Sequence, residues 1–310
     1  MSKVTVFGAG NVGATCAHVL AQRDLAQVCL IDIVEGMPQG KALDIRQAGP
    51  LQDFGVEVTG SNDFAACRGS DVVVVTAGLA RKPGMDRMEL LGKNTSIVAG
   101  IAKSIRENAP DAVIVMVTNP LDVMTYVAWK VSGFPRERVL GMAGVLDSSR
   151  FRTFIAMELG VSVVDVSAMV LGGHGDTMVP LPRFSTVNGV PITEILDAAA
   201  IQRLSDRTRK GGAEIVNLLK TGSAFYAPGT SAAQMAEAVV KDRGHVLPCS
   251  VWLQGEFGLR DVFCGVPVVL GKGGMKRIVP LALNDGEKAM LAKSADDVRK
   301  GQAEVTPFLS

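Results

Sequence analysis

The chain has 310 residues, of which 47% are hydrophobic, and a formal net charge of +1. This length and apolar content suit a globular protein with a sizeable core and room for two domains. The near-neutral charge argues against a broad electrostatic partner such as a nucleic acid or an anionic membrane. No apolar run reaches the roughly 18 residues that a membrane helix needs.

The first half of the chain alternates short apolar runs with helical patterns. We expect strands at 3–7, 28–33, 56–59, 71–76 and 112–118, and helices at about 12–22, 40–47 and 88–108. The second of these helices should end at Gly49-Pro50, a strong stop signal. The runs at 72–75 and 113–117 show no polar alternation, as is typical of parallel strands covered on both faces. The succession predicts an N-terminal doubly wound parallel sheet of the Rossmann type.

The pattern changes near residues 141–146. A helix at about 148–159 follows, then hairpin-like strands, further helices and a final helix at about 287–302. We therefore expect an α/β protein of two domains, residues 1–143 and residues 144–310, the second of α+β type. The apolar segment after Lys3 superficially resembles a signal peptide, but its three spaced glycines and its place as the first strand argue against that interpretation.

Five cysteines occur, at positions 16, 29, 67, 249 and 264. Their spacings fit no zinc motif, so we expect no metal site. Most lie in apolar stretches and are interpreted as reduced core thiols, which favours a reducing, cytoplasmic location.

A dinucleotide-binding fingerprint opens the chain. The segment Gly8-Ala9-Gly10-Asn11-Val12-Gly13 follows the first strand and begins the first helix, as a GxGxxG motif requires. Gly8 permits a tight turn, Gly10 allows a pyrophosphate to approach the backbone, and Gly13 lets the helix pack on the strand. The motif alone is weak evidence, but Asp32 ends the second strand about 20 residues later. Its carboxylate would accept hydrogen bonds from the ribose hydroxyls and repel a 2′-phosphate, favouring NAD over NADP.

A single histidine, His174, lies in a glycine-framed loop, Gly172-Gly173-His174-Gly175-Asp176. Histidine suits the removal of a hydroxyl proton because its pKa lies near neutrality. Asp147 would fix the histidine tautomer if the fold brings the two together. The alternative is that Asp147 only caps a helix that begins at Ser148.

Three arginines and an asparagine follow predicted strands or share a helix with Asp147. Arg81 and Arg87 lie in a loop after the strand at 71–76, on the side of the sheet where ligands bind in such folds, although an ordinary solvated basic loop is the alternative. Arg150 is one helical turn from Asp147 and suits a carboxylate, unless it forms only a surface ion pair. Asn119, in Thr118-Asn119-Pro120, is placed to hydrogen-bond a substrate oxygen, or else serves turn chemistry alone.

Together these motifs resemble the lactate/malate dehydrogenase superfamily, in the family order and over essentially the whole chain. The resemblance is strongest to the lactate-dehydrogenase-like malate dehydrogenases of prokaryotes. The motifs that carry it are the glycine fingerprint with Asp32, Ala77-Gly78 with Arg81-Lys82-Pro83-Gly84-Met85-Asp86-Arg87, Thr118-Asn119-Pro120, Leu146-Asp147-Ser148-Ser149-Arg150 and the His174 loop.

The resemblance implies a role for each site residue. His174 would be the proton acceptor in malate oxidation, paired with Asp147. Arg150 would bind the carboxylate beside the reacting carbon, and Arg87 would polarise the carbonyl oxygen of oxaloacetate. Arg81 occupies the specificity position, where malate dehydrogenases carry arginine and lactate dehydrogenases typically carry glutamine.

The resemblance also implies an NAD-binding first domain, a substrate-binding second domain and a homo-oligomer, with a tetramer favoured over a dimer. The implied cofactor contacts come from Gly8, Ala9, Gly10, Asn11, Val12, Gly13, Asp32, Asn94, Val117, Thr118 and Asn119. Two other functions remain open: a lactate or other 2-hydroxyacid dehydrogenase on the same fold, and a non-enzymatic NAD-binding regulator. Arg81 argues against the first, and the set of His174, Asp147, Arg150 and Arg87 argues against the second.

Overall fold

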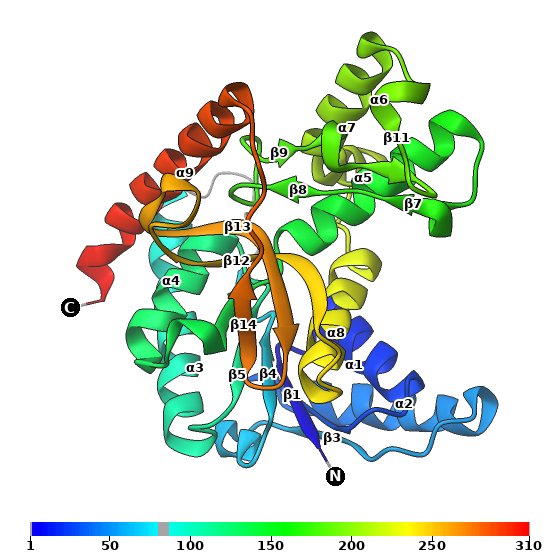
Figure 1. The fold of residues 1–310 in the computed structure, drawn as a ribbon. Helices are drawn as coiled ribbons and strands as arrows, with labels where there is room; N and C mark the ends of the chain where they lie inside the picture. The colour runs from blue at the N-terminus through cyan, green and yellow to red at the C-terminus, as the bar shows by residue number, and fades with distance from the viewer. Residues whose placement is uncertain (1, 80–86, 310) are drawn as a thin grey trace.

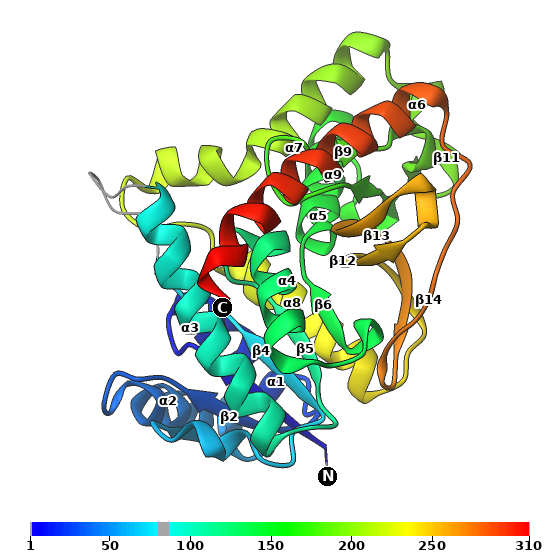
Figure 2. The ribbon, with the colours of Figure 1, turned by 90° about the vertical axis from the view of Figure 1, so that its left-hand side faces the viewer.

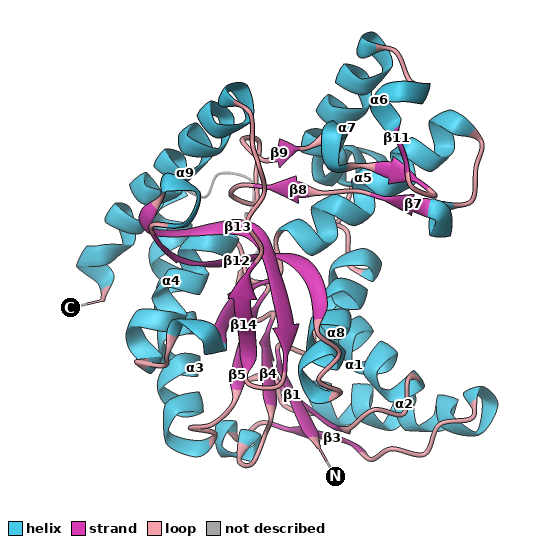
Figure 3. Ribbon diagram, in the orientation of Figure 1, coloured by secondary structure: helices cyan, strands magenta, loops and turns pink. Residues whose placement is uncertain are grey.

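The computed structural model describes residues 2–79 and 87–309. Within them one nine-stranded sheet runs through the molecule in the order β14-β13-β12-β6-β5-β4-β1-β2-β3, with helices on both of its faces (Figures 1 and 3). Its strands are β1 (Lys3–Phe7), β2 (Gln27–Ile31), β3 (Val58–Ser61), β4 (Val72–Val75), β5 (Val113–Met116), β6 (Val139–Gly141), β12 (His245–Gln254), β13 (Arg260–Gly271) and β14 (Gly274–Ile278).

The strands β1 to β6 are parallel and form a doubly wound arrangement. β1 pairs with β2 on one side and with β4 on the other, so Val4 lies opposite both Val28 and Val72. The chain order therefore reverses between β1 and β4, which is the point where such sheets bind ligands outside the carboxyl ends of their strands. The predicted Rossmann arrangement is confirmed.

Apolar side chains on both faces of the parallel strands explain why these strands read as unbroken hydrophobic runs. In β4, Val72 and Val74 belong to the core that includes α1 (Asn11–Gln22) and α8 (Tyr226–Val240). Val73 and Val75 belong to the core under α3 (Arg87–Asn108) and α4 (Leu121–Ser132), the pair of helices on the other face (Figure 2). Burial on both faces removes the polar alternation of a half-exposed sheet.

The second half of the chain adds a smaller lobe and also extends the sheet. The lobe gathers at the top right of Figure 1 around a core that includes Phe151, Ile155 and Leu204. It comprises α5 (Gly144–Leu159), α6 (Ile192–Ile195), α7 (Ala198–Leu219), β7 (Val166–Ser167), β8 (Val170–Leu171), β9 (Val179–Pro180), β10 (Thr186–Val187) and β11 (Val190–Pro191).

Three other elements of the second half pack on the first. β12 pairs antiparallel with β6 through Ser250 and Gly141. α8 lies against α1, and an Arg23–Glu237 ion pair of 2.6 Å joins the two helices. α9 (Asp285–Val305) begins at a capping box formed by Asn284 and Glu287 and packs on α4. The halves of the sequence therefore share one sheet and one of its core faces.

Two expected helix ends are wrong. α2 (Met37–Gln52) runs through Gly49 and Pro50, because the proline falls in the last turn, where it removes only one intrahelical hydrogen bond. Gly49 is needed there for another reason, since a Cβ on it would lie 2.8 Å from the Phe54 carbonyl oxygen. α5 begins at Gly144 and not at Ser148, which places Asp147 inside its first turn.

The five cysteines are all buried and free of disulfides. Burial raises the pKa of the Cys16 thiol to about 12, so this thiol stays protonated and packs as a small apolar side chain. In the described part of the chain, no helix has both the length and the apolar content to cross a membrane.

Candidate active site

The glycine-rich turn between β1 and α1 packs tightly against its own backbone. Gly8 has φ +100°, and a Cβ at Gly13 would overlap the Gly8 carbonyl oxygen, so neither position accepts a side chain. Apart from its neighbours in the chain, no atom of the described residues would lie within 4 Å of a Cβ on Gly10. The backbone of Gly10 therefore faces open space at the N-terminus of α1, which suits a pyrophosphate.

Asp32 follows β2 and lies directly beside this turn. One carboxylate oxygen accepts the Ala9 backbone N–H at 2.7 Å, and the other accepts the Val34 N–H at 3.0 Å. Each oxygen has a second lone pair with which to accept a ribose hydroxyl. The turn and the carboxylate together fit the phosphate and ribose of a dinucleotide.

The carboxyl ends of β4 and β5 are held together by buried side chains. The Thr118 hydroxyl donates to the Ala77 carbonyl at 2.7 Å. Asn94, 1% exposed in α3, accepts the Leu79 N–H at 2.8 Å and donates to the Asn119 carbonyl at 3.0 Å. The Asn94 amide thus binds the backbone that follows β4 and the backbone that follows β5, and its contact with a cofactor stays a prediction. Val117 is buried, whereas Asn119 is exposed at the end of its strand.

The structure brings together His174, from the loop after β8, and Asp147, from α5. His174 Nδ1 lies 2.8 Å from Asp147 Oδ2, and the aspartate side chain is only 2% exposed. Because a carboxylate only accepts hydrogen bonds, Nδ1 carries the proton and Nε2 is the nitrogen left with a lone pair. The alternative in which Asp147 only caps a helix is wrong, since Asp147 lies within α5 and its side chain contacts the histidine.

Burial and charge act in opposite directions on His174. Burial disfavours the charged ring and lowers its pKa, but the charge and hydrogen bond of Asp147 and the charge of Asp122 outweigh this, so the pKa of His174 is raised. The imidazole is thereby prepared to hold a proton taken from a substrate.

Arg150 lies beside the same aspartate, and part of its guanidinium has no hydrogen-bond partner among the described residues. Its Nη1 is 3.4 Å from Asp147 Oδ1, and its side chain is 13% exposed. Its Nε is buried and has no hydrogen-bond partner among the described residues. Burial lowers the pKa of Arg150 and the Asp147 charge opposes this. A buried guanidinium with a free N–H is suited to receive a carboxylate from a ligand.

Several residues that support this site were not predicted from the sequence. Asp122 accepts the His174 backbone N–H at 2.7 Å, and Ser294 accepts the Gly173 N–H at 2.9 Å. In α7, Gly211 leaves room for Arg150, because a Cβ there would lie 3.0 Å from Arg150 Cδ. Spacing could not reveal these contacts, since each joins residues more than 50 positions apart.

Two predicted arginines cannot be placed at the site. Arg81 lies outside the described residues, and Arg87 begins α3 without a described side chain. Their roles stay predictions.

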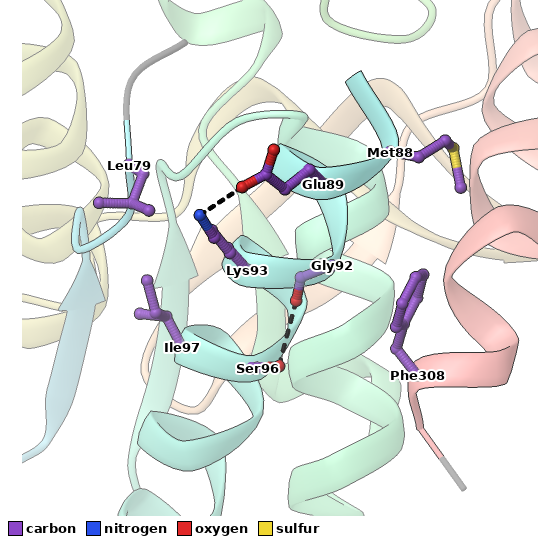
Figure 4. Close-up of a pocket in the computed structure, with 8 residues that line it drawn as sticks. All are labelled: Leu79, Met88, Glu89, Gly92, Lys93, Ser96, Ile97 and Phe308. Carbon is purple, nitrogen blue, oxygen red and sulfur yellow. Dashed lines mark hydrogen bonds and ion pairs between the residues drawn. The ribbon is translucent and has the colours of Figure 1, made fainter. Parts of the chain in front are cut away.

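A cavity of about 430 Å³ lies beside the start of α3 (Figure 4). Leu79, Met88 and Phe308 supply apolar surface to it, and an ion pair of 2.6 Å joins Lys93 to Glu89 at its edge. Neither His174 nor Arg150 lines it. Among the described residues, no group of three or more His, Cys, Asp or Glu side chains is placed to hold a metal ion.

Comparison with known proteins identifies the family of this arrangement. Residues 2–141 match the NAD binding domain of lactate/malate dehydrogenase, and residues 144–309 match its alpha/beta C-terminal domain. The chain belongs to the lactate/malate dehydrogenase family. Membership makes it an NAD-dependent oxidoreductase.

Relatives within the family carry both of its names. A malate dehydrogenase of Roseiflexus sp. (strain RS-1) is 55% identical over 296 residues, which cover 96% of either chain. The solved malate dehydrogenase of Salinibacter ruber has a TM-score of 0.94 at 52% identity and covers 99% of this chain and 98% of its own. A lactate dehydrogenase of Cryptosporidium parvum, solved with lactic acid and NAD, also has a TM-score of 0.94, at 42% identity and 97% coverage of both chains. Backbone shape therefore does not separate the two activities.

Proposed function

We propose that this protein is an NAD-dependent malate dehydrogenase that interconverts (S)-malate and oxaloacetate. The observation that carries the proposal is the buried pair of His174 and Asp147 beside Arg150, whose buried Nε has no hydrogen-bond partner among the described residues. The names of the relatives at 52–55% identity support malate as the substrate. A lactate dehydrogenase is the second candidate, because the Cryptosporidium enzyme shares the backbone equally well.

The glycine turn and Asp32 fit the cofactor. Gly8 to Gly13 and Asp32 would hold the pyrophosphate and adenosine ribose, while Asn94 and the segment Val117–Asn119 would frame the nicotinamide end. NAD bound there would supply the acceptor for the hydride that leaves the substrate carbon, and NADH the donor in the reverse direction. The rest of the chemistry falls to side chains of this chain.

Those side chains would hold the substrate and move one proton. Arg150 binds the carboxylate next to the hydroxyl-bearing carbon, and Arg81 binds the distal carboxylate. His174 Nε2 takes the hydroxyl proton, and Asp147 stabilises the imidazolium that results. Arg87 stabilises negative charge on the substrate oxygen in the reduction direction, and Asn119 hydrogen-bonds the same substrate.

The distal carboxylate would decide between the candidate substrates. In a closed pocket, the charge of Arg81 needs a partner, which oxaloacetate supplies and pyruvate lacks. An unpaired buried charge costs several kcal/mol, and about 1.4 kcal/mol is a factor of ten in selectivity. We therefore expect a preference for oxaloacetate of at least about a thousandfold in kcat/KM.

We also propose a domain division, an oligomeric state and a cellular location for this protein. Residues 1–143 would bind NAD, and residues 144–310 would supply most of the substrate site. We propose a cytoplasmic homo-oligomer, a tetramer in preference to a dimer, that serves the tricarboxylic acid cycle and binds neither nucleic acid nor membrane. Exposed leucines on α2, Leu43 and Leu51, are apolar surface available for a subunit contact. Light scattering after size-exclusion chromatography measures the oligomeric state.

The decisive experiment follows NADH oxidation with oxaloacetate and pyruvate in parallel. Fast turnover of oxaloacetate alone supports the proposal, and preference for pyruvate overturns the substrate but keeps the chemistry. Tight NADH binding without turnover of either would indicate a non-enzymatic regulator. In the same assay, His174→Asn should lower kcat by about a hundredfold or more while the Kd of NADH is unchanged.

A further inference from the structure

The loop that carries His174 is anchored to three elements that come from distant parts of the sequence. Gly172 exchanges two backbone hydrogen bonds, of 2.9 and 3.0 Å, with Gly265 of β13. The Gly173 N–H donates to Ser294 of α9 at 2.9 Å, and the His174 N–H donates to Asp122 of α4 at 2.7 Å. Of the three anchors, only Asp122 bears an ionisable side chain at the histidine itself.

Asp122 is a buried carboxylate with both oxygens engaged. It is 4% exposed, and its Oδ1 accepts the Ser250 hydroxyl at 2.6 Å while its Oδ2 accepts the His174 N–H. Burial raises the pKa of Asp122, and these two donated hydrogen bonds oppose that rise by stabilising the ionised form. Since each oxygen acts as an acceptor, the carboxylate needs no proton of its own to satisfy its surroundings.

Asp122 also connects the histidine to the other side of the site. It lies in the first turn of α4, three residues after Asn119, whose segment is the candidate contact for substrate and nicotinamide. The start of α4 therefore links Asn119 to the carboxylate that accepts the His174 backbone N–H. Moving the carboxylate would move the histidine relative to that segment.

Few charged side chains surround His174 and Asp122 in the part of the chain that the structure describes. The described ionisable groups that act on His174 and Asp122 are Asp147 and Arg150 of α5 and the buried Cys264 thiol of β13. Ser250 and Ser294 face them from β12 and α9 without charge. Among the described side chains, two carboxylates thus oppose one guanidinium around the imidazole.

We propose that Asp122 is a positioning residue for His174, whose ionised carboxylate holds the His174 backbone N–H and adds a second negative charge to that of Asp147. The inference rests on the proposed function, in which His174 exchanges the substrate proton. Asp147 orients the imidazole ring through its contact with Nδ1, and Asp122 fixes the position of the His174 backbone that carries the ring.

Two substitutions separate the hydrogen bond from the charge. Asp122→Asn keeps an oxygen for the His174 N–H and an amide for Ser250 but removes the charge. Asp122→Leu fills the space and removes both. Ser294→Ala is the matched control, because it deletes an anchor of the same loop without altering any charge.

The readouts are the pH profile of kcat/KM for oxaloacetate reduction, kcat, the Kd of NADH and a thermal melt. Reduction needs a protonated His174, so the rate falls as the pH rises through the histidine pKa. Removing a nearby negative charge lowers that pKa, and the falling limb of Asp122→Asn should therefore lie at lower pH than in wild type. Ser294→Ala should keep the wild-type limb, and Asp122→Leu should lose about tenfold or more in kcat with the Kd of NADH unchanged.

The two Asp122 variants test whether this carboxylate positions His174. The inference is overturned if the Asp122→Asn limb coincides with that of wild type, or if a folded Asp122→Leu keeps wild-type kcat. Where Asp122→Leu does not fold, the pH profile of Asp122→Asn decides alone. A wild-type enzyme that turns over neither oxaloacetate nor pyruvate would instead refute the proposed function, so the two failures are distinguishable.

Discussion

At the scale of single residues, the site is built from charges that are buried but paired. Asp147 is shared between His174 at 2.8 Å and Arg150 at 3.4 Å, and all three side chains have little contact with solvent. In such surroundings a charge has large effects on its neighbours, and removing one partner leaves the others uncompensated.

Asp147→Asn tests the source of the raised His174 pKa. The wild-type histidine holds its proton to a higher pH than a free imidazole, since the aspartate charge and hydrogen bond outweigh burial. Without that charge, burial dominates and the pKa falls, so the alkaline limb of oxaloacetate reduction should move to lower pH. We also expect a loss of about a hundredfold in kcat, because the imidazolium loses its counter-charge. A limb that stays in place would show that Asp147 does not govern the titration.

Arg81→Gln tests the specificity assigned to a residue outside the described part of the chain. Glutamine can hydrogen-bond the distal carboxylate but cannot balance its charge. The ratio of kcat/KM for oxaloacetate over pyruvate should fall by about a hundredfold, mainly through oxaloacetate. Steady-state kinetics with both substrates measure it, and an unchanged ratio would refute the role of Arg81.

At the scale of elements, a glycine in α7 allows that helix to pack closely against the arginine of the candidate site. Gly211 in α7 faces Arg150, and a Cβ there would lie 3.0 Å from Arg150 Cδ. The glycine costs α7 helix propensity. Because Gly211 lies opposite the Arg150 side chain, we infer that its role is to leave room for that side chain and not to stabilise the helix.

Gly211→Ala should therefore separate stability from substrate binding. Alanine gains about 0.5–1 kcal/mol within a helix, offset in part by the displaced arginine, while KM for oxaloacetate should rise several-fold. Gly100→Ala in α3 is the matched control, since its Cβ would meet nothing within 4 Å. Chemical denaturation and steady-state kinetics measure the two effects. An unchanged KM in Gly211→Ala would show that Arg150 can shift without weakening its binding of oxaloacetate.

At the scale of the whole molecule, the sheet and one core face are shared between the two halves of the chain. β6 pairs with β12, and α8 covers the side of the parallel sheet where α1 also packs. Residues 1–143 expressed alone would expose this apolar face and an unpaired strand edge. We therefore do not expect residues 1–143 and residues 144–310 to fold independently of each other.

We accordingly expect full-length protein to unfold in one cooperative thermal transition and fragment 1–143 to show none. Circular dichroism and calorimetry compare the two, and co-expression with fragment 144–310 should restore the transition. A fragment that unfolds sharply near the Tm of the full chain would contradict this expectation.

Local patterns along the chain were sufficient for the parallel sheet, the glycine turn with Asp32 and the candidates His174, Asp147 and Arg150. Each of these depends on residues close in sequence, or on the rule that parallel strands end at one edge of the sheet. The stop expected at Gly49-Pro50 and the helix start expected at Ser148 are wrong, because a proline in the last turn of α2 removes only one intrahelical hydrogen bond and because α5 already begins at Gly144.

Only the tertiary structure decided what holds the site in place. Asp122 is 52 residues from His174 and 128 from Ser250, and Ser294 is 121 residues from Gly173. No periodicity connects positions so far apart, and a buried aspartate in a helix has no sequence signal of its own. The amino-acid sequence determines which groups can do the chemistry, and the packing of α4, α7 and α9 determines where those groups are held.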